Sequence, residues 1–102
     1  MPAYLVVEAK IYDREGFAEY ARRVPELVAR YGGEYIVMGG QQEALEGDWS
    51  GSRIVVHRWP DMAAARAFWS SPEYTGAKQL REGTGEFRVI LVEGSQEQVL
   101  ES

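Results

Sequence analysis

The 102-residue sequence contains no cysteine, which excludes a disulfide framework, a thiolate nucleophile and a cysteine-ligated metal site. It contains one histidine, His57, whereas zinc sites need several His or Cys ligands. A single histidine leaves haem ligation open as an alternative. The composition favours a protein without metal or cofactor.

Positive charge is also scarce. There are 11 Lys and Arg against 16 Asp and Glu, the net charge is -5, and no run of basic residues occurs. Nucleic-acid binders need clustered positive charge, so we expect no nucleic-acid partner. No apolar run approaches the roughly 18 residues of a membrane span, and the start of the chain lacks the features of a signal peptide. We therefore expect a cytoplasmic protein without a membrane partner.

Apolar residues at every second position predict β-strands. The strands are expected at residues 3–11, 34–38, 53–59 and 86–92. Gly39–Gly40 should form a bulge or bend, after which residues 41–45 continue extended. One domain of residues 1–94 and a polar tail of residues 95–102 are predicted.

Apolar residues at steps of three and four predict two helices, between the first and second and between the third and fourth strands. The first is capped by Asp13, should be kinked or split at Pro25 and ends at Gly32–Gly33. The second follows Pro60–Asp61, restarts at Ser71–Pro72 and runs to about residue 82. The βαββαβ order predicts an α+β, ferredoxin-like sandwich, an antiparallel four-stranded sheet with helices on one face.

The third strand has an apolar face with Ile54 and Val56 and a mixed face. The mixed face carries Arg53, Val55, His57 and Trp59. We expect this mixed face, with Tyr4 and Val6, to lie on the open side of the sheet, where it is too apolar to stay wet. A second copy covering it would give a homodimer, and a monomer with a ligand platform is the alternative. The first strand is expected to run parallel to the third and to place Glu8 beside His57.

Candidate catalytic residues gather around residues 46–60. Glu46 and Asp48 flank a glycine in a loop that could aim a carboxylate as a general acid or base, although both could be solvated turn formers. His57 could transfer protons if a carboxylate held it, or it could pack at a subunit interface. Trp49 could wall a ligand pocket or anchor the loop.

Further candidate substrate-binding residues lie outside this loop. The guanidinium groups of Arg53 and Arg81 match the geometry of a substrate carboxylate, although surface ion pairs are the commoner role of arginine. Tyr20 and Tyr74 could direct hydroxyl groups into a cleft or pack in the core. Phosphate-binding loops, nucleophile elbows and zinc-protease motifs are absent from the sequence.

Several short motifs together resemble the domain of unknown function 1330 family, within the dimeric α/β-barrel superfamily. They are Tyr31-Gly32-Gly33, Glu46-Gly47-Asp48-Trp49, Trp59-Pro60, Trp69, Ser71-Pro72-Glu73-Tyr74 and Arg81. The likeness covers about residues 3–94. It implies a homodimer whose sheets pair their open faces, with a small-molecule cleft between sheet and helices. His57 is not part of this pattern.

Two functional hypotheses follow. The first is a homodimer that binds a small molecule. It could act as a cofactor-independent enzyme that uses Glu46, Asp48 or His57 for proton transfer on a small organic acid or aromatic metabolite. The alternative is a non-catalytic dimeric module that binds a metabolite or assists a partner. Ligand binding without turnover would favour the module.

Overall fold

The computed structural model describes residues 1–95, so nearly all of the predicted polar tail lies outside the described residues. The elements are β1 Ala3–Ile11, α1 Arg14–Arg30, β2 Glu34–Met38, β3 Arg53–Trp59, α2 Met62–Trp69, α3 Pro72–Gln79 and β4 Gly85–Glu93. The first three strands have the predicted limits, and the fourth is one residue longer at each end.

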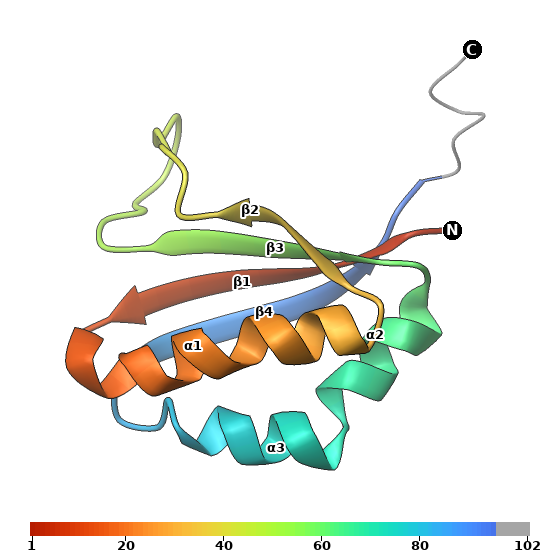
Figure 1. The fold of residues 1–102 in the computed structure, drawn as a ribbon. Helices are drawn as coiled ribbons and strands as arrows, with labels where there is room; N and C mark the ends of the chain where they lie inside the picture. Colours follow the sequence, from red (N-terminus) through yellow and green to blue (C-terminus); the bar gives the residue numbers. More distant parts are fainter. Residues whose placement is uncertain (96–102) are drawn as a thin grey trace.

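The strands form one antiparallel four-stranded sheet in the order β2-β3-β1-β4. Helices α1, α2 and α3 lie on one face of this sheet, and no helix of the described residues 1–95 covers the other face (Figure 1). The predicted ferredoxin-like α+β architecture is therefore confirmed. No helix within residues 1–95 is long and apolar enough to cross a membrane.

The register of β1 and β3 corrects the predicted orientation of β3. The two strands run antiparallel, not parallel, and buried Ala3 and Leu5 pair with Trp59 and His57. Because paired residues share a face of the sheet, the Arg53, Val55, His57 and Trp59 set points toward the helices. The prediction that this set lies on the open face is wrong.

The outer face, meaning the side of the sheet without helices, carries the other alternate residues. Its apolar members are Tyr4, Val6, Val37, Ile54, Val56, Ile90 and Val92. Glu8 also lies there, opposite Ile54, where it accepts a hydrogen bond from Ser52 Oγ at 2.8 Å and pairs with Arg88 at 3.3 Å. Glu8 is thus separated from His57 by the sheet, and the predicted contact between them does not form.

Each helix begins at a side-chain cap predicted from the sequence. Asp13 accepts a hydrogen bond from Gly16 N at 3.0 Å, and Asp61 accepts one from Ala64 N at 2.8 Å. At the start of α3, Ser71 Oγ accepts from Tyr74 N at 3.1 Å. These bonds satisfy amides that have no partner within the helix.

The helices differ from the prediction in two places. Helix α1 is not split at Pro25 but continues as one element, because Val24 and Val28 on its inner face stay anchored in the core while proline removes a single amide donor. Helix α3 ends at Gln79, and turns occupy the following residues. Gly83, at φ +77°, reverses the chain toward β4.

The connection between β2 and β3 is less regular than predicted. The strand register shifts between Tyr35 and Val37, and the strand ends at Met38, so residues 41–45 do not continue it. The side-chain amide of Gln42 forms hydrogen bonds to the backbone at the start of β3, where β2 no longer pairs with it. Its Nε2 donates to Ser52 O at 2.7 Å, and its Oε1 accepts from Ile54 N at 3.2 Å.

The core lies between the sheet and the helices. Trp59, 1% exposed, and Phe68 pack with ring centroids 4.9 Å apart, beside Val28 and Ala65. Gly33 leaves space for this indole, since a Cβ there would lie 2.7 Å from an atom of Trp59. This aromatic centre fills one part of the inner layer, and the space beside it stays open.

Candidate functional site

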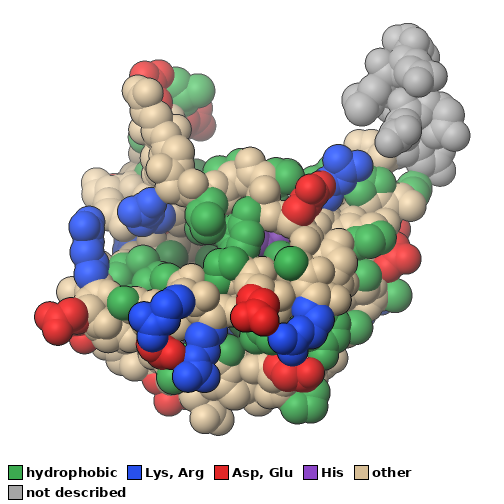
Figure 2. Space-filling model, in the orientation of Figure 1, with side chains coloured by type: hydrophobic (Ala, Val, Ile, Leu, Met, Phe, Trp, Pro, Cys, Tyr) green, Lys and Arg blue, Asp and Glu red, His purple; other side chains and the backbone are tan. Residues whose placement is uncertain are grey.

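A cavity of about 380 Å³ opens between the sheet and the helices. Helix α1, strands β1 to β4, the end of α2 and helix α3 with the turn after it all contribute to its walls. In the space-filling view, hydrophobic side chains border the hollow and the purple of the histidine is visible inside it (Figure 2). The volume falls within the range of small-molecule sites, which begins at about 300 Å³.

His57 forms one side of the cavity. Its ring stands edge-on to Tyr35, with centroids 4.4 Å apart, and also contacts the aromatic core at Trp59 and Phe68. The residue is 6% exposed, and this burial lowers the pKa of the imidazole to about 4, because the charged form loses its hydration. His57 is therefore neutral at pH 7, and its buried Nδ1 has no hydrogen-bond partner among residues 1–95.

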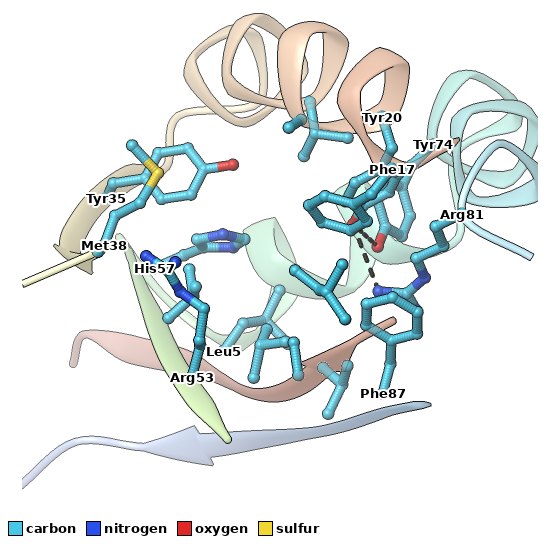
Figure 3. A pocket seen from close by; sticks show the side chains of 18 of the residues that line it. Leu5, Phe17, Tyr20, Tyr35, Met38, Arg53, His57, Tyr74, Arg81 and Phe87 are labelled. Carbon is cyan, nitrogen blue, oxygen red and sulfur yellow. Dashed lines mark hydrogen bonds between the residues drawn. The ribbon is translucent and has the colours of Figure 1, made fainter. Parts of the chain in front are cut away.

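A pair of hydroxyl groups lies on the opposite side of the cavity (Figure 3). The oxygens of Tyr20, from α1, and Tyr74, from α3, are 2.7 Å apart. Burial and the neighbouring Tyr74 raise the pKa of Tyr20 well above its ordinary value. Burial likewise raises the pKa of Tyr35 to about 12. The hydroxyls of Tyr20 and Tyr35 therefore stay protonated at pH 7 and can donate hydrogen bonds.

Arg81 adjoins the hydroxyl pair and completes this side (Figure 3). Its guanidinium lies 4.3 Å from the centre of the Phe87 ring, and its Nη1 is 3.5 Å from the Tyr20 hydroxyl oxygen. The turn after α3 holds its backbone, because Thr84 donates from both its amide and its hydroxyl to Arg81 O. Arg81 is thus a buried cation packed against aromatic rings.

The charged residues of the cavity lining are all basic. Arg14 and Arg53 are exposed members of the lining, Arg81 is buried, and no aspartate or glutamate of residues 1–95 lines the cavity. The rest of the lining is mainly aliphatic and aromatic. The site therefore combines an apolar body with positive charge, in a chain whose net charge is -5.

The structure brings five of the eight predicted site residues to this cavity. They are His57, Tyr20, Arg53, Tyr74 and Arg81. The other three, Glu46, Asp48 and Trp49, lie in the loop between β2 and β3, outside the cavity lining.

Within that loop, the three residues mainly contact the loop itself. Trp49 Nε1 donates to Glu46 O at 2.8 Å, and Asp48 Oδ1 accepts from Ser50 N at 3.1 Å. The bond from Ser50 lowers the pKa of the exposed Asp48 carboxyl. Glu46 and Trp49 border a shallow groove that reaches Ile54 on the outer face. The predicted clustering of these residues with His57 does not occur in the chain.

Sequence reasoning missed several lining residues. Phe17 precedes Tyr20 on α1 by three positions, so the helical repeat that places Tyr20 inward also places Phe17 inward, and Arg14 lies a further three positions back, at the start of the helix. Tyr35 is paired with His57, a register that depends on the bulge in β2 and has no signal in the sequence. No cluster of three or more potential metal ligands occurs within residues 1–95.

The family model described as Domain of unknown function (DUF1330) matches residues 2–95 of the sequence. No curated protein matches it at a significant level.

Solved structures with low sequence identity share the fold. RPA0582 from Rhodopseudomonas palustris, a protein of unknown function, has a TM-score of 0.73 at 19% identity, over 93% of this chain and 83% of its own. SnoaB from Streptomyces nogalater, a cofactor-independent oxygenase, has a TM-score of 0.68 at 16% identity, over 93% and 94%. A dimeric ferredoxin-like protein of unknown function from Bacteroides fragilis has a TM-score of 0.56 at 15% identity, over 91% and 96%.

Proposed function

The chain belongs to the Domain of unknown function (DUF1330) family, and we propose that it binds a small organic molecule in the cavity between the sheet and the helices. The cavity itself carries this proposal. It joins about 380 Å³ of mainly apolar space to a few convergent polar groups, which is the usual composition of a small-molecule site.

His57 gives the proposal chemical support. A buried polar atom without a hydrogen-bond partner is costly, and native structures contain few of them. The Nδ1 atom of His57 is such an atom on a residue that lines the cavity. A ligand that supplies a donor or acceptor there would remove the cost.

A second candidate function is proton transfer without a cofactor. His57 lines the cavity and its buried Nδ1 has no hydrogen-bond partner among residues 1–95, so it is the residue we propose as general base. The similarly folded SnoaB is described as a cofactor-independent oxygenase, which supports this chemistry on such a fold. Glu46 and Asp48 are not part of this proposal because they lie outside the cavity.

We also propose that two chains pair through the outer face of the sheet. Exposed apolar side chains from β2 and β4, among them Val37, Ile90 and Val92, lie on that face. Apolar patches of this kind mark interaction sites, and the Bacteroides fragilis neighbour is described as dimeric. The pairing would leave the cavity on the opposite side of each sheet.

Fluorescence titration with N-phenyl-naphthylamine, a neutral aromatic dye, tests binding in the cavity. Val55→Phe adds a ring on the cavity side of β3, whereas Val56→Phe adds the same ring on the outer face. We expect the first variant to weaken binding about tenfold, or about 1.4 kcal/mol, and the second to leave it within about twofold. Equal effects of both variants, or no dye binding to the unchanged protein, would contradict the proposal.

Turnover separates the two candidate functions. Organic compounds that raise the unfolding temperature are incubated with the protein and followed by mass spectrometry. Conversion that disappears in His57→Phe, while binding remains, supports proton transfer by His57. Binding without conversion of any of these compounds supports a non-catalytic binding module.

A further inference from the structure

We infer that the ligand is an organic anion, with a flat apolar body and one carboxylate or comparable anionic oxygen group that Arg81 and Tyr74 bind. This inference rests on the proposed function and specifies the ligand class. It assigns the anion to the side of the cavity opposite His57 (Figure 3).

The first observation is the missing counter-ion of Arg81. The residue is 9% exposed, yet no carboxylate among residues 1–95 forms an ion pair with it. Buried charges in proteins are normally paired, because removing a charge from water is costly. The ion pairs formed among residues 1–95 all involve other arginines. An anion can therefore bind at Arg81.

Counting hydrogen-bond donors gives the second observation. A guanidinium has five N–H donors, and the described bonds of the Arg81 side chain use one of them, at 3.5 Å to the Tyr20 hydroxyl oxygen. The 2.7 Å contact between the Tyr20 and Tyr74 oxygens uses one of their two protons, and either oxygen can be its donor. The other proton is free, and we assign it to Tyr74. Donors therefore exceed acceptors on this side of the cavity.

The remaining lining defines the body of the ligand. Phe17 and Phe87 stack with ring centroids 5.8 Å apart and planes 14° from parallel, and Arg81 lies over the face of Phe87. Aliphatic side chains of the sheet, including Leu5 and Val89, form the floor. Aromatic and aliphatic walls favour a flat, apolar ligand body.

The exposed lining arginines add long-range attraction. Arg14 and Arg53 line the cavity, and the part of the chain that the structure describes places no carboxylate opposite them in the lining. A cleft lined by charge of one sign raises the local concentration of ligands of the opposite sign. We therefore assign Arg14 and Arg53 to the approach of the anion and Arg81 to its binding.

A matched pair of competitors tests the charge of the ligand. Naphthoate and naphthamide have the same ring system, but only naphthoate carries a negative charge. Each compound is titrated against the complex of N-phenyl-naphthylamine with the unchanged protein and with its variants, and displacement of the dye is measured. We expect naphthoate to displace the dye at a concentration about tenfold lower than naphthamide, since hydrogen bonds to a charged group are stronger than those between neutral groups.

Arg81→Gln should reverse this preference, because a carboxylate loses its hydration in the cavity and gains no cation in return. Arg66→Gln removes an exposed arginine that does not line the cavity and should leave the preference unchanged. Tyr74→Phe should reduce the preference a few-fold. If Arg81→Gln does not fold, Arg81→Lys keeps the charge, loses the planar fork and should lower the preference severalfold.

The outcomes separate the two proposals. Dye binding without a preference for naphthoate, or a preference that Arg81→Gln or Arg81→Lys leaves intact, overturns the anion inference and leaves the proposed binding function standing. Absence of dye binding, or insensitivity of dye binding to Val55→Phe, overturns the proposed function and the inference together.

Discussion

His57 and Tyr35 are paired across β2 and β3 and stand edge-on, with ring centroids 4.4 Å apart and ring planes at 81°. The tyrosine ring covers an imidazole that Trp59 and Phe68 also border. This aromatic enclosure excludes water from the imidazole, and loss of hydration is the cause of its low pKa. The strand register therefore contributes to the low pKa of His57, because it places the Tyr35 ring against the imidazole.

The depressed pKa of His57 predicts a stability loss in mild acid. The folded pKa is about 4 and the ordinary value is 6.5. Above pH 6.5 both states are neutral, and below it the unfolded chain binds a proton that the folded chain rejects until about pH 4. We expect this residue to contribute a loss of roughly 2–3 kcal/mol across that interval.

Urea unfolding at several pH values measures the loss. In His57→Phe the slope of stability against pH between 4 and 6.5 should be smaller than in the unchanged protein. The carboxylates of the chain contribute to both pH profiles, so the difference between the two profiles reports on His57. Parallel pH profiles for the two proteins would contradict the prediction.

The hydroxyl pair of Tyr20 and Tyr74 predicts coupled mutational effects. Each Tyr→Phe substitution leaves one partly buried hydroxyl without its partner and should cost about 1–2 kcal/mol. The double variant removes both hydroxyls and should cost less than the sum, by about 0.5–1 kcal/mol. A double-mutant cycle of chemical denaturation measures this term, and strict additivity would show that the 2.7 Å contact contributes nothing.

Two glycines predict opposite effects of the same substitution. A Cβ at Gly33 would lie 2.7 Å from a ring atom of the buried Trp59, so Gly33→Ala should destabilise by about 1–3 kcal/mol. A Cβ at Gly76, inside α3, would meet nothing within 4 Å, so Gly76→Ala should stabilise by about 0.5–1 kcal/mol. Denaturation midpoints at constant m-value provide the measurement. Effects of the same sign would refute the steric argument.

The proposed dimer predicts a mass change on one substitution in the outer face. Sedimentation should give twice the 11.5 kDa of one chain at micromolar concentration. Val56→Glu places a charge on the outer face and should yield monomers, because an unpaired charge in an interface is costly. Ala67→Glu, on an exposed position of α2, is the control and should remain dimeric. A monomeric unchanged protein would end the proposal.

The sequence was sufficient to predict the strands, because periodicity and turn residues are local signals. It did not reveal which side of β3 faces the helices. The alternation of residues along β3 shows that Ile54 and His57 lie on opposite faces of the strand. By polarity alone, the more apolar face, with Ile54, is the one expected to pack in the core. The inner face instead includes His57 and Arg53 because it lines a cavity, and a cavity lining need not be the most apolar face.

The candidate site was predicted in part for a related reason. Asp48 and His57 are close in sequence, but from Arg53 to His57 an extended strand spans about 13 Å. His57 is therefore carried away from the loop, whereas Tyr20 and Arg81, distant in sequence, are brought together by packing of α1 beside the end of α3. Contacts of this kind depend on tertiary structure and leave no local pattern.

The pleat of β3 also bears on how the family could diversify. Val55 and Val56 are consecutive, yet one lines the cavity and the other lies on the outer face. A substitution at Val55 alters the cavity wall and leaves the outer face as it is, and a substitution at Val56 does the reverse. The two surfaces of one strand can therefore change independently of each other in related sequences.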